Sequence, residues 1–143
     1  MQSTPLSEHV DSGLFQAIVE QAPDAIIFAD RDGAIRVWNV GAETLFGYSA
    51  AEVLGSSLDV IIPERLRNAH WAGFRKALDS GHTKYAGQVL TTRSIHKSGN
   101  RLYVDLSFSM VRDCAGVVLG ALAIGRDCTA RYLADHEQKK PES

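Results

Sequence analysis

The spacing of hydrophobic positions changes along the chain, and each change predicts a different kind of element. After Asp11 or Ser12, either of which can cap a helix, apolar side chains recur at the spacing of an amphipathic helix, at Leu14, Phe15, Ile18 and Val19. Two strand-like runs follow, "AIIFAD" and "AIRVWN", and the "RDG" between them supplies Gly33 for a tight turn. The first third of the chain therefore predicts a helix followed by a β-hairpin.

The middle of the chain has a helical pattern that is broken into short pieces. The stretch "NVGAETLFGYSAAEVLGSSL" holds too many small residues and glycines for one long helix. Ser49 followed by Glu52 matches a capping box, which predicts a short helix at that point. Pro63 suits the first turn of a longer helix, which is expected to run to about Asp79 and to stop at Gly81.

The last third of the chain has the composition and alternation of β-strands. Three β-rich runs, "GQVLTTRSIHK", "RLYVDLSFSMV" and "VVLGALAIGRD", are joined by short connections that contain glycine. In the middle run the apolar residues all fall on one face, at Leu102, Val104, Leu106, Phe108 and Met110. The order of elements predicts an α+β fold, in which short helices and one longer helix cover one face of a five-stranded antiparallel sheet and enclose a pocket.

Length and charge narrow the class of function. The chain has 143 residues, 45% of them hydrophobic, which is enough for one domain with a real core. Its 15 basic and 17 acidic residues give a formal net charge of -2 and build no basic face, so binding of nucleic acid is not expected. The N-terminus lacks the pattern of a signal peptide, and no apolar run is long enough to span a bilayer. We therefore expect a cytoplasmic protein without membrane contact.

Candidate catalytic and metal-binding groups are few. Glu43, Asp105 and the segment "RSIHKSGN" supply titratable side chains, but no nucleophile, base and orienting group form a recognisable set, so we expect no enzyme. Cys114 and Cys128 have neither CxxC spacing nor a nearby histidine pair. Two buried or half-buried free thiols are therefore expected, and not a zinc site or a disulfide.

These elements and several motifs together resemble a PAS domain, a sensory module of many bacterial signalling proteins. The similarity runs from about Leu14 to Arg131 and rests on "APDAIIFADRDGAIRVWNVGAETLFGYSAAEVLG", "IIPERLRNAHWAGF" and "HKSGNRLYVDLSFSMVRDCAGVVLGALAIGRDCTAR". It implies a PAS domain over residues 11–131 that includes the N-terminal helix, a flexible tail over residues 1–10, and a short helical or disordered tail over residues 132–143. Because the chain ends soon after the last strand, we expect the output module to be a separate polypeptide.

The resemblance makes haem a candidate cofactor. In the haem-binding PAS domains of rhizobial oxygen-sensor histidine kinases a histidine on the long helix is the iron ligand, and "PERLRNAH" places His70 at the corresponding position. The spacing of His70 from Leu66 and Phe74 puts it on the helix stripe expected to face the sheet. Those sensors carry an arginine where this chain has Leu90, and an apolar side chain does not stabilise bound oxygen. Carbon monoxide, nitric oxide or redox state thus become equal candidates for the signal.

Further pocket residues follow from the same resemblance. Leu106 and Phe108 match apolar positions that line the distal face in that family, and Ile124 is assigned to the same pocket; such residues also belong to the core of any PAS fold. Trp38 ends the second strand, where a lining or lid role and plain packing are equally open. The flavin photochemistry of light-sensing PAS domains is not expected, because Leu58 stands at the place of their cysteine.

Two alternatives stay open for His70 and for the chain as a whole. His70 is either an iron ligand or a packed, hydrogen-bonded side chain, as in many PAS domains with no established cofactor. The chain is accordingly either a sensor that binds haem or another small molecule and signals to a separate partner, or a ligand-free module for protein interaction. The apolar face of the N-terminal helix favours the second alternative, because it could pack across a dimer axis instead of onto its own sheet, and we expect a homodimer. The other possibility for this face is that it only caps the sheet.

Overall fold

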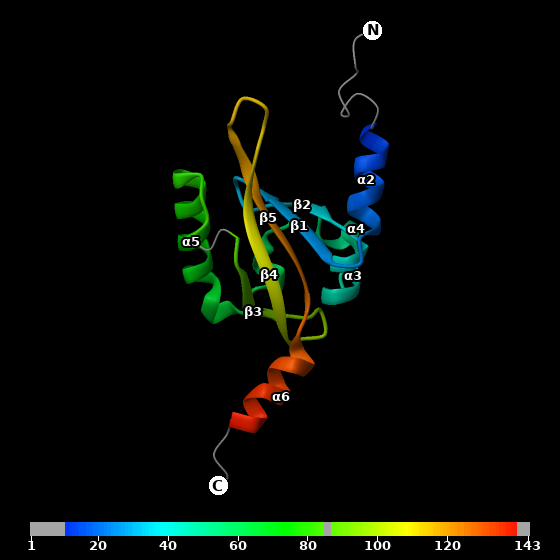
Figure 1. The fold of residues 1–143 in the computed structure, drawn as a ribbon, viewed down its shortest axis with the longest axis vertical. Coiled ribbons are helices and arrows are strands. Elements are labelled where there is room, and N and C mark those ends of the chain that lie inside the picture. The colour runs from blue at the N-terminus through cyan, green and yellow to red at the C-terminus, as the bar shows by residue number, and fades with distance from the viewer. Residues whose placement is uncertain (1–10, 85–86, 140–143) are drawn as a thin grey trace.

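The computed structural model describes residues 11–84 and 87–139, and an antiparallel sheet lies at the centre of the molecule. Its five strands are β1 (Ala25–Asp30), β2 (Ile35–Trp38), β3 (Val89–Ile95), β4 (Arg101–Arg112) and β5 (Val118–Asp127), in the order β2-β1-β5-β4-β3 (Figure 1). The chain enters through the β1–β2 hairpin, leaves for a helical segment and returns through the last three strands. Strands β1 and β5 therefore pair at the centre, and the predicted α+β fold is confirmed.

The helices occupy two kinds of position. They are α2 (Ser12–Gln21), α3 (Val40–Phe46), α4 (Ala50–Val53), α5 (Arg67–Ser80) and α6 (Thr129–Lys139), with the 3-10 turns η1 (Leu58–Ile61) and η2 (Glu64–Leu66) before α5. The segment from α3 to α5 packs on the sheet, whereas α2 and α6 extend from opposite ends of the molecule (Figure 1). No helix in the described part of the chain is long and apolar enough to cross a membrane.

Several helix ends lie where the sequence signals predict. Asp11 caps α2, because its side chain accepts a hydrogen bond from the backbone N–H of Leu14 at 2.7 Å. Ser49 and Glu52 form the predicted capping box of α4. Gly81 ends α5 in the left-handed conformation, with a φ of 76°, which suits a residue without a side chain.

The start of the long helix differs from the prediction. Pro63 precedes the 3-10 turn η2, and the α-helix begins only at Arg67. Neither Pro63 nor Leu66 offers a side-chain cap to the free backbone N–H groups. The first turn is therefore a tighter 3-10 turn, a common way to end or begin an α-helix.

The hydrophobic core lies between the helical segment and one face of the sheet. Its largest fully buried side chains come from β2, β4 and the short helices: Ile35, Val104, Phe46 and Val53. The predicted alternation along β4 is confirmed, since Leu102, Val104 and Leu106 are buried and the next two apolar residues of that face pack against the same core. This burial of apolar surface is the main stabilising contribution to the fold.

The expectations for the ends and the cysteines have different outcomes. The tail over residues 1–10 lies outside the described residues, and beyond Arg131 the helix α6 continues to Lys139, with residues 140–143 again outside them. Cys128 is buried, but Cys114 is exposed, so the expectation of burial was wrong for Cys114. The reason is that Cys114 lies in the β4–β5 connection, where residues 112–117 are all exposed.

Candidate functional site

His70 lies in the first turn of α5, and its imidazole is half-buried. Its Nδ1 atom is buried and has no hydrogen-bond partner among the described residues. The rings of Trp71 and Phe74 lie near it, at centroid distances of 4.6 and 6.0 Å. Burial lowers the pKa of the imidazole below its ordinary value of 6.5, and the nearby Asp59 carboxylate opposes this only in part. His70 is therefore neutral at neutral pH, which is the form that binds a metal.

Asp59, in η1, organises the polar side of this cluster. Its carboxylate accepts a hydrogen bond from the indole N–H of Trp71 at 2.7 Å, and the Nε atom of Arg67 lies 3.9 Å from the same oxygen. The Trp71 ring also packs against Gly33 in the β1–β2 hairpin, where any side chain in place of glycine would collide with it. Trp71 thus joins α5 to the hairpin beside His70. The sequence does not reveal Asp59, because its partners lie further along the chain on another element.

Three of the predicted site residues lie on the sheet face that the helices cover. Leu90 on β3 and Leu106 on β4 are register partners, and Leu106 also lies opposite Gly125 on β5. Phe108 is two positions further along β4, on the same face, and is partly buried against the core. Opposite Leu106, Phe108 and Met110 of β4, strand β5 contributes only small residues, namely Gly125, Ala123 and Ala121. The sheet therefore presents an apolar wall to the helices, with small residues along its central strand.

Trp38 lies on the same face of the sheet, but on β2, at the edge opposite to β3. Register partners on β1 and β5 connect it to Phe108, so about three strand spacings, roughly 14 Å, separate the two residues. Trp38 is 5% exposed, its ring lies 5.4 Å from that of Phe46, and its indole N–H donates to the backbone carbonyl of Tyr48 at 3.0 Å. Of the two roles that the sequence left open, the structure supports packing.

Ile124 lies on the other face of the sheet, which corrects its assignment to the pocket. It is opposite Ile26 on β1 and Ser107 on β4, and Ser107 points away from the face that carries Leu106 and Phe108. Strand β5 has apolar residues on both of its faces, so the sequence pattern alone does not tell which of them is the inner face. The pairing of β5 with β1 and β4 identifies the inner face.

The chemistry of these residues fits haem. Many haem proteins supply one axial ligand to the iron from a histidine. The neutral imidazole of His70 can act as such a ligand, because its buried Nδ1 lacks a partner among the described residues. The apolar side chains of Leu90, Leu106 and Phe108 suit the macrocycle, although Leu90 offers no hydrogen bond to a bound gas. Among residues 11–84 and 87–139 no group of three or more metal-binding side chains is found, so the donor set suits haem better than zinc.

Comparison with known proteins agrees with this fold. The PAS fold family matches residues 13–128. The oxygen sensor protein DosP of Escherichia coli is 27% identical over 140 residues, which make up 98% of this chain and 17% of DosP. The sensor protein FixL of Bradyrhizobium diazoefficiens is 36% identical over 55 residues, or 38% of this chain and 11% of FixL. The chain thus spans less than a fifth of the length of these curated relatives.

A solved structure supports the same architecture. The PAS domain of a protein from Colwellia psychrerythraea is similar with a TM-score of 0.71 and 24% identity, over 83% of this chain and 98% of that one. At this identity the likeness supports the fold alone. Because the family matches most of the chain and the sheet has the corresponding form, the chain belongs to the PAS fold family.

Proposed function

We propose that this PAS domain is a sensor that binds haem through His70 and passes a change of shape to a separate signalling protein. The observation that carries the proposal is the neutral imidazole of His70, whose buried Nδ1 has no partner among the described residues. His70 lies on the helix on which the haem-binding PAS domains that this chain resembles carry their ligand. Similarity to an oxygen sensor over 98% of the chain supports the same function.

The residues of the apolar wall favour a particular kind of signal. Bound haem would supply reversible binding of a small gas molecule or a change of redox state. Leu90 has no hydrogen-bond donor to stabilise bound oxygen. Carbon monoxide, nitric oxide and redox state are therefore candidates for the signal equal to oxygen. We propose no catalytic step.

Strand β4 offers a route from the apolar wall to α6. It carries Leu106 and Phe108 on its inner face and Asp105 on its outer face, and Asp105 contacts the guanidinium of Arg131 in α6 at 2.8 Å. On the same outer face Tyr103 stacks on Tyr132 of α6, with 3.7 Å between ring centroids. A shift of β4 on ligand binding would therefore move α6, which we propose as the element that the partner reads.

Absorption spectra after haem addition test the role of His70. We expect a Soret band in the unaltered protein, its loss or weakening in His70→Ala, and its recovery when free imidazole replaces the missing side chain. His82→Ala is the matched control, because His82 is exposed in the loop after α5 and should leave the band unchanged. A band of equal strength in the unaltered protein and His70→Ala, or no band in either, would remove His70 as a haem ligand.

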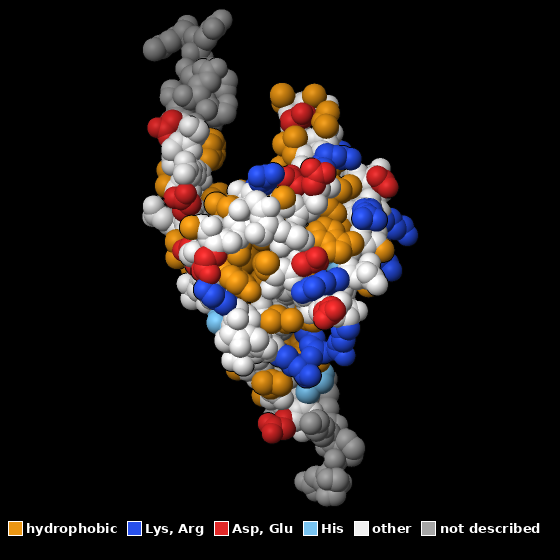
Figure 2. All heavy atoms as spheres, turned by 180° about the vertical axis from the view of Figure 1, so that it is seen from behind, with side chains coloured by type: hydrophobic (Ala, Val, Ile, Leu, Met, Phe, Trp, Pro, Cys, Tyr) orange, Lys and Arg blue, Asp and Glu red, His pale blue; other side chains and the backbone are white. Residues whose placement is uncertain are grey.

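A second candidate function is a ligand-free interaction module, and one observation favours it. Nothing in the part of the chain that the structure describes covers the apolar face of α2: Leu14, Phe15 and Ile18 are 47, 54 and 57% exposed, and α2 contains no buried residue. Hydrophobic side chains are visible on the surface of this helix (Figure 2). The outer face of the sheet carries further half-buried apolar residues, at Ile26, Phe28, Leu122 and Ile124. Surfaces of this kind mark sites of protein association, and we propose a second copy of the chain as the occupant.

A further inference from the structure

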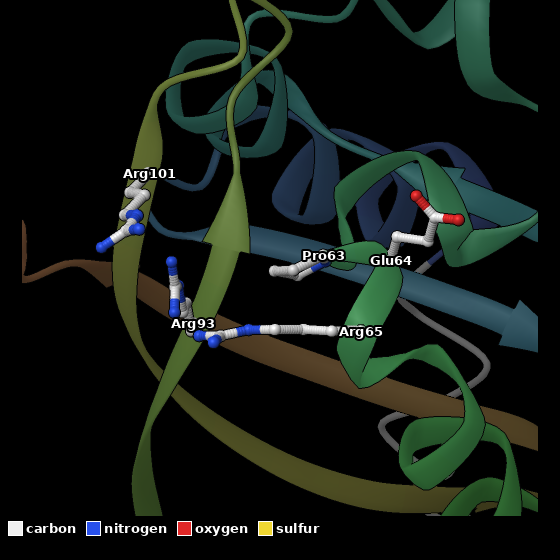
Figure 3. A pocket seen from close by; sticks show the side chains of 5 residues that line it. All are labelled: Pro63, Glu64, Arg65, Arg93 and Arg101. Atoms are coloured by element: carbon white, nitrogen blue, oxygen red, sulfur yellow. The ribbon is translucent and has the colours of Figure 1, made fainter.

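We propose that Arg65, Arg93 and Arg101 form a binding site for a phosphate group. They come from η2, β3 and β4, and together with Pro63 and Glu64 they line one open pocket (Figure 3). The pocket lies beside β3, which is the edge strand of the sheet, so no strand of the described residues covers it. The side chain of Arg65 extends toward Arg93, and the guanidinium of Arg93 points toward Arg101 (Figure 3).

The positive charge of this pocket is not balanced by the part of the chain that the structure describes. Four other arginines, at positions 36, 67, 126 and 131, each lie against an aspartate, whereas none of the ion pairs among residues 11–84 and 87–139 involves the three arginines of the pocket. Glu64 is the acidic residue in the lining, and its carboxylate points away from the guanidinium groups (Figure 3). Like charges brought together without a counter-charge repel one another, and an anionic ligand would remove that repulsion.

Arg93 supplies a second, independent observation. Its Nε atom is buried and has no hydrogen-bond partner among the described residues. Buried donors in folded proteins are nearly always paired, and an unpaired one is destabilising. An anion that draws the flexible side chain of Arg93 further into the pocket would give this N–H an oxygen acceptor and would compensate the charge.

A phosphate group suits three guanidinium groups better than a carboxylate does. Each guanidinium can donate two parallel hydrogen bonds to phosphate or carboxylate oxygens. A single arginine can therefore bind both oxygens of a carboxylate. A phosphate monoester has three free oxygens and about 1.5 to 2 negative charges at neutral pH, enough for several arginines. The pocket measures about 570 Å³, which leaves room beside Pro63 for an organic group attached to the phosphate. The ligand is therefore inorganic phosphate or a small phosphorylated molecule.

Calorimetric titration of the full chain at low ionic strength tests the site, with inorganic phosphate, adenosine monophosphate and adenosine as probes. We expect both anions to bind and adenosine not to bind. Arg93→Gln and the double variant Arg65→Gln/Arg101→Gln should each weaken phosphate binding by about tenfold or more, because each removes charged hydrogen bonds. Lys76→Gln is the control, since Lys76 is an exposed cation on α5 outside the pocket and its loss should leave the affinity unchanged.

The variants also separate a binding role from a structural one. Arg65 and Arg101 are exposed, so their replacement decides the question even where Arg93→Gln fails to fold. Tighter binding of adenosine monophosphate than of phosphate would identify a phosphorylated molecule as the ligand, and equal affinities would identify the ion itself. Absence of binding by both anions, or equal weakening by Lys76→Gln, would overturn the proposal. The site shares no residue with the haem candidate, so either proposal can fail alone.

Discussion

Asn39 joins three elements, α2, β1 and α3, at one corner of the molecule. It is 2% exposed, and its Oδ1 atom accepts the backbone N–H groups of Ile26 on β1 and Ala42 on α3, at 2.8 and 2.9 Å. Its Nδ2 group donates to three backbone carbonyls at the end of α2 and just after it, those of Val19, Ala22 and Asp24. One side chain thus caps α3 and holds α2 and β1 at the same corner, as expected for an asparagine between a strand and a helix.

Replacing Asn39 should therefore lower the free energy of unfolding by more than the loss of one helix cap does. Asn39→Ala is expected to lower the free energy of unfolding by about 2 to 4 kcal/mol, because it removes an N-cap and leaves buried backbone groups without partners. Ser49→Ala removes only the cap of α4, and should cost about 1 kcal/mol. Urea unfolding of both variants measures the difference. A loss in Asn39→Ala no larger than that in Ser49→Ala would contradict the bridging role.

At the scale of elements, Asp105 joins β4 to its neighbours and to α6. Its carboxylate accepts hydrogen bonds from the Thr91 hydroxyl at 2.7 Å and the Cys128 thiol at 3.4 Å, and it contacts the Arg131 guanidinium at 2.8 Å. The hydrogen bond from Thr91, followed by that from Arg131, holds the pKa of Asp105 below its ordinary 3.8. The charged form of Asp105 therefore stabilises the contact between the sheet and the first turn of α6.

This pKa shift makes the attachment of α6 sensitive to acid. A carboxylate with a lowered pKa in the folded state stabilises that state above its unfolded pKa, and the contribution is lost as the pH falls through the lowered value. We expect the NMR signals of the Arg131 guanidinium, the group of α6 that contacts Asp105, to shift as the pH falls below 3.8.

Asp105→Asn is the control for this titration. It removes the charge, so α6 should be loosened already at pH 7 and should show no such shift. Glu52, whose pKa is lowered to about 2 chiefly by Lys97, titrates in a similar range, but it contacts the β3–β4 connection and not α6. The same acid profile of the Arg131 signals in both proteins would show that Asp105 does not control the helix.

At the scale of the whole molecule, α2 and α6 extend from opposite ends and only the segment from α3 to α5 encloses the core (Figure 1). The exposed face of α2 is the surface for which we propose a second copy of the chain as occupant. Stable interfaces have an apolar centre, and Phe15 and Ile18 are the most exposed large apolar residues of α2.

Light scattering during size-exclusion chromatography measures this association. We expect a dimer for the full chain and a monomer for Phe15→Ser/Ile18→Ser and for a chain that lacks residues 1–22. Leu54→Ser, which changes a similarly exposed apolar residue on another surface, should leave the dimer intact. A monomeric full chain, or a dimer that persists in the α2 variants, would contradict association through this helix.

Local patterns explain how much of the fold could be predicted. Asp11, Ser49 and Gly81 act through hydrogen bonds or backbone conformation within a few residues, so their roles are visible in the sequence. The alternation along β4 identifies its inner face because polar residues occupy the other face. The start of α5 was misplaced because Pro63 is compatible with a 3-10 turn as well as with an α-helix.

Some features of the candidate site could likewise be predicted from local patterns, and others could not. Residue spacing in the sequence predicted that a helix carries His70 and that an apolar strand face carries Leu106 and Phe108, and the resemblance of the motifs to PAS domains implied the fold. The folded arrangement was needed to show that Ile124 faces outward, that Asp59 holds Trp71 beside His70, and that Arg65 lines one pocket with Arg93 and Arg101. Those relations join segments that are distant in the chain, and they depend on which strands pair and which loop crosses the edge of the sheet, which no local pattern specifies.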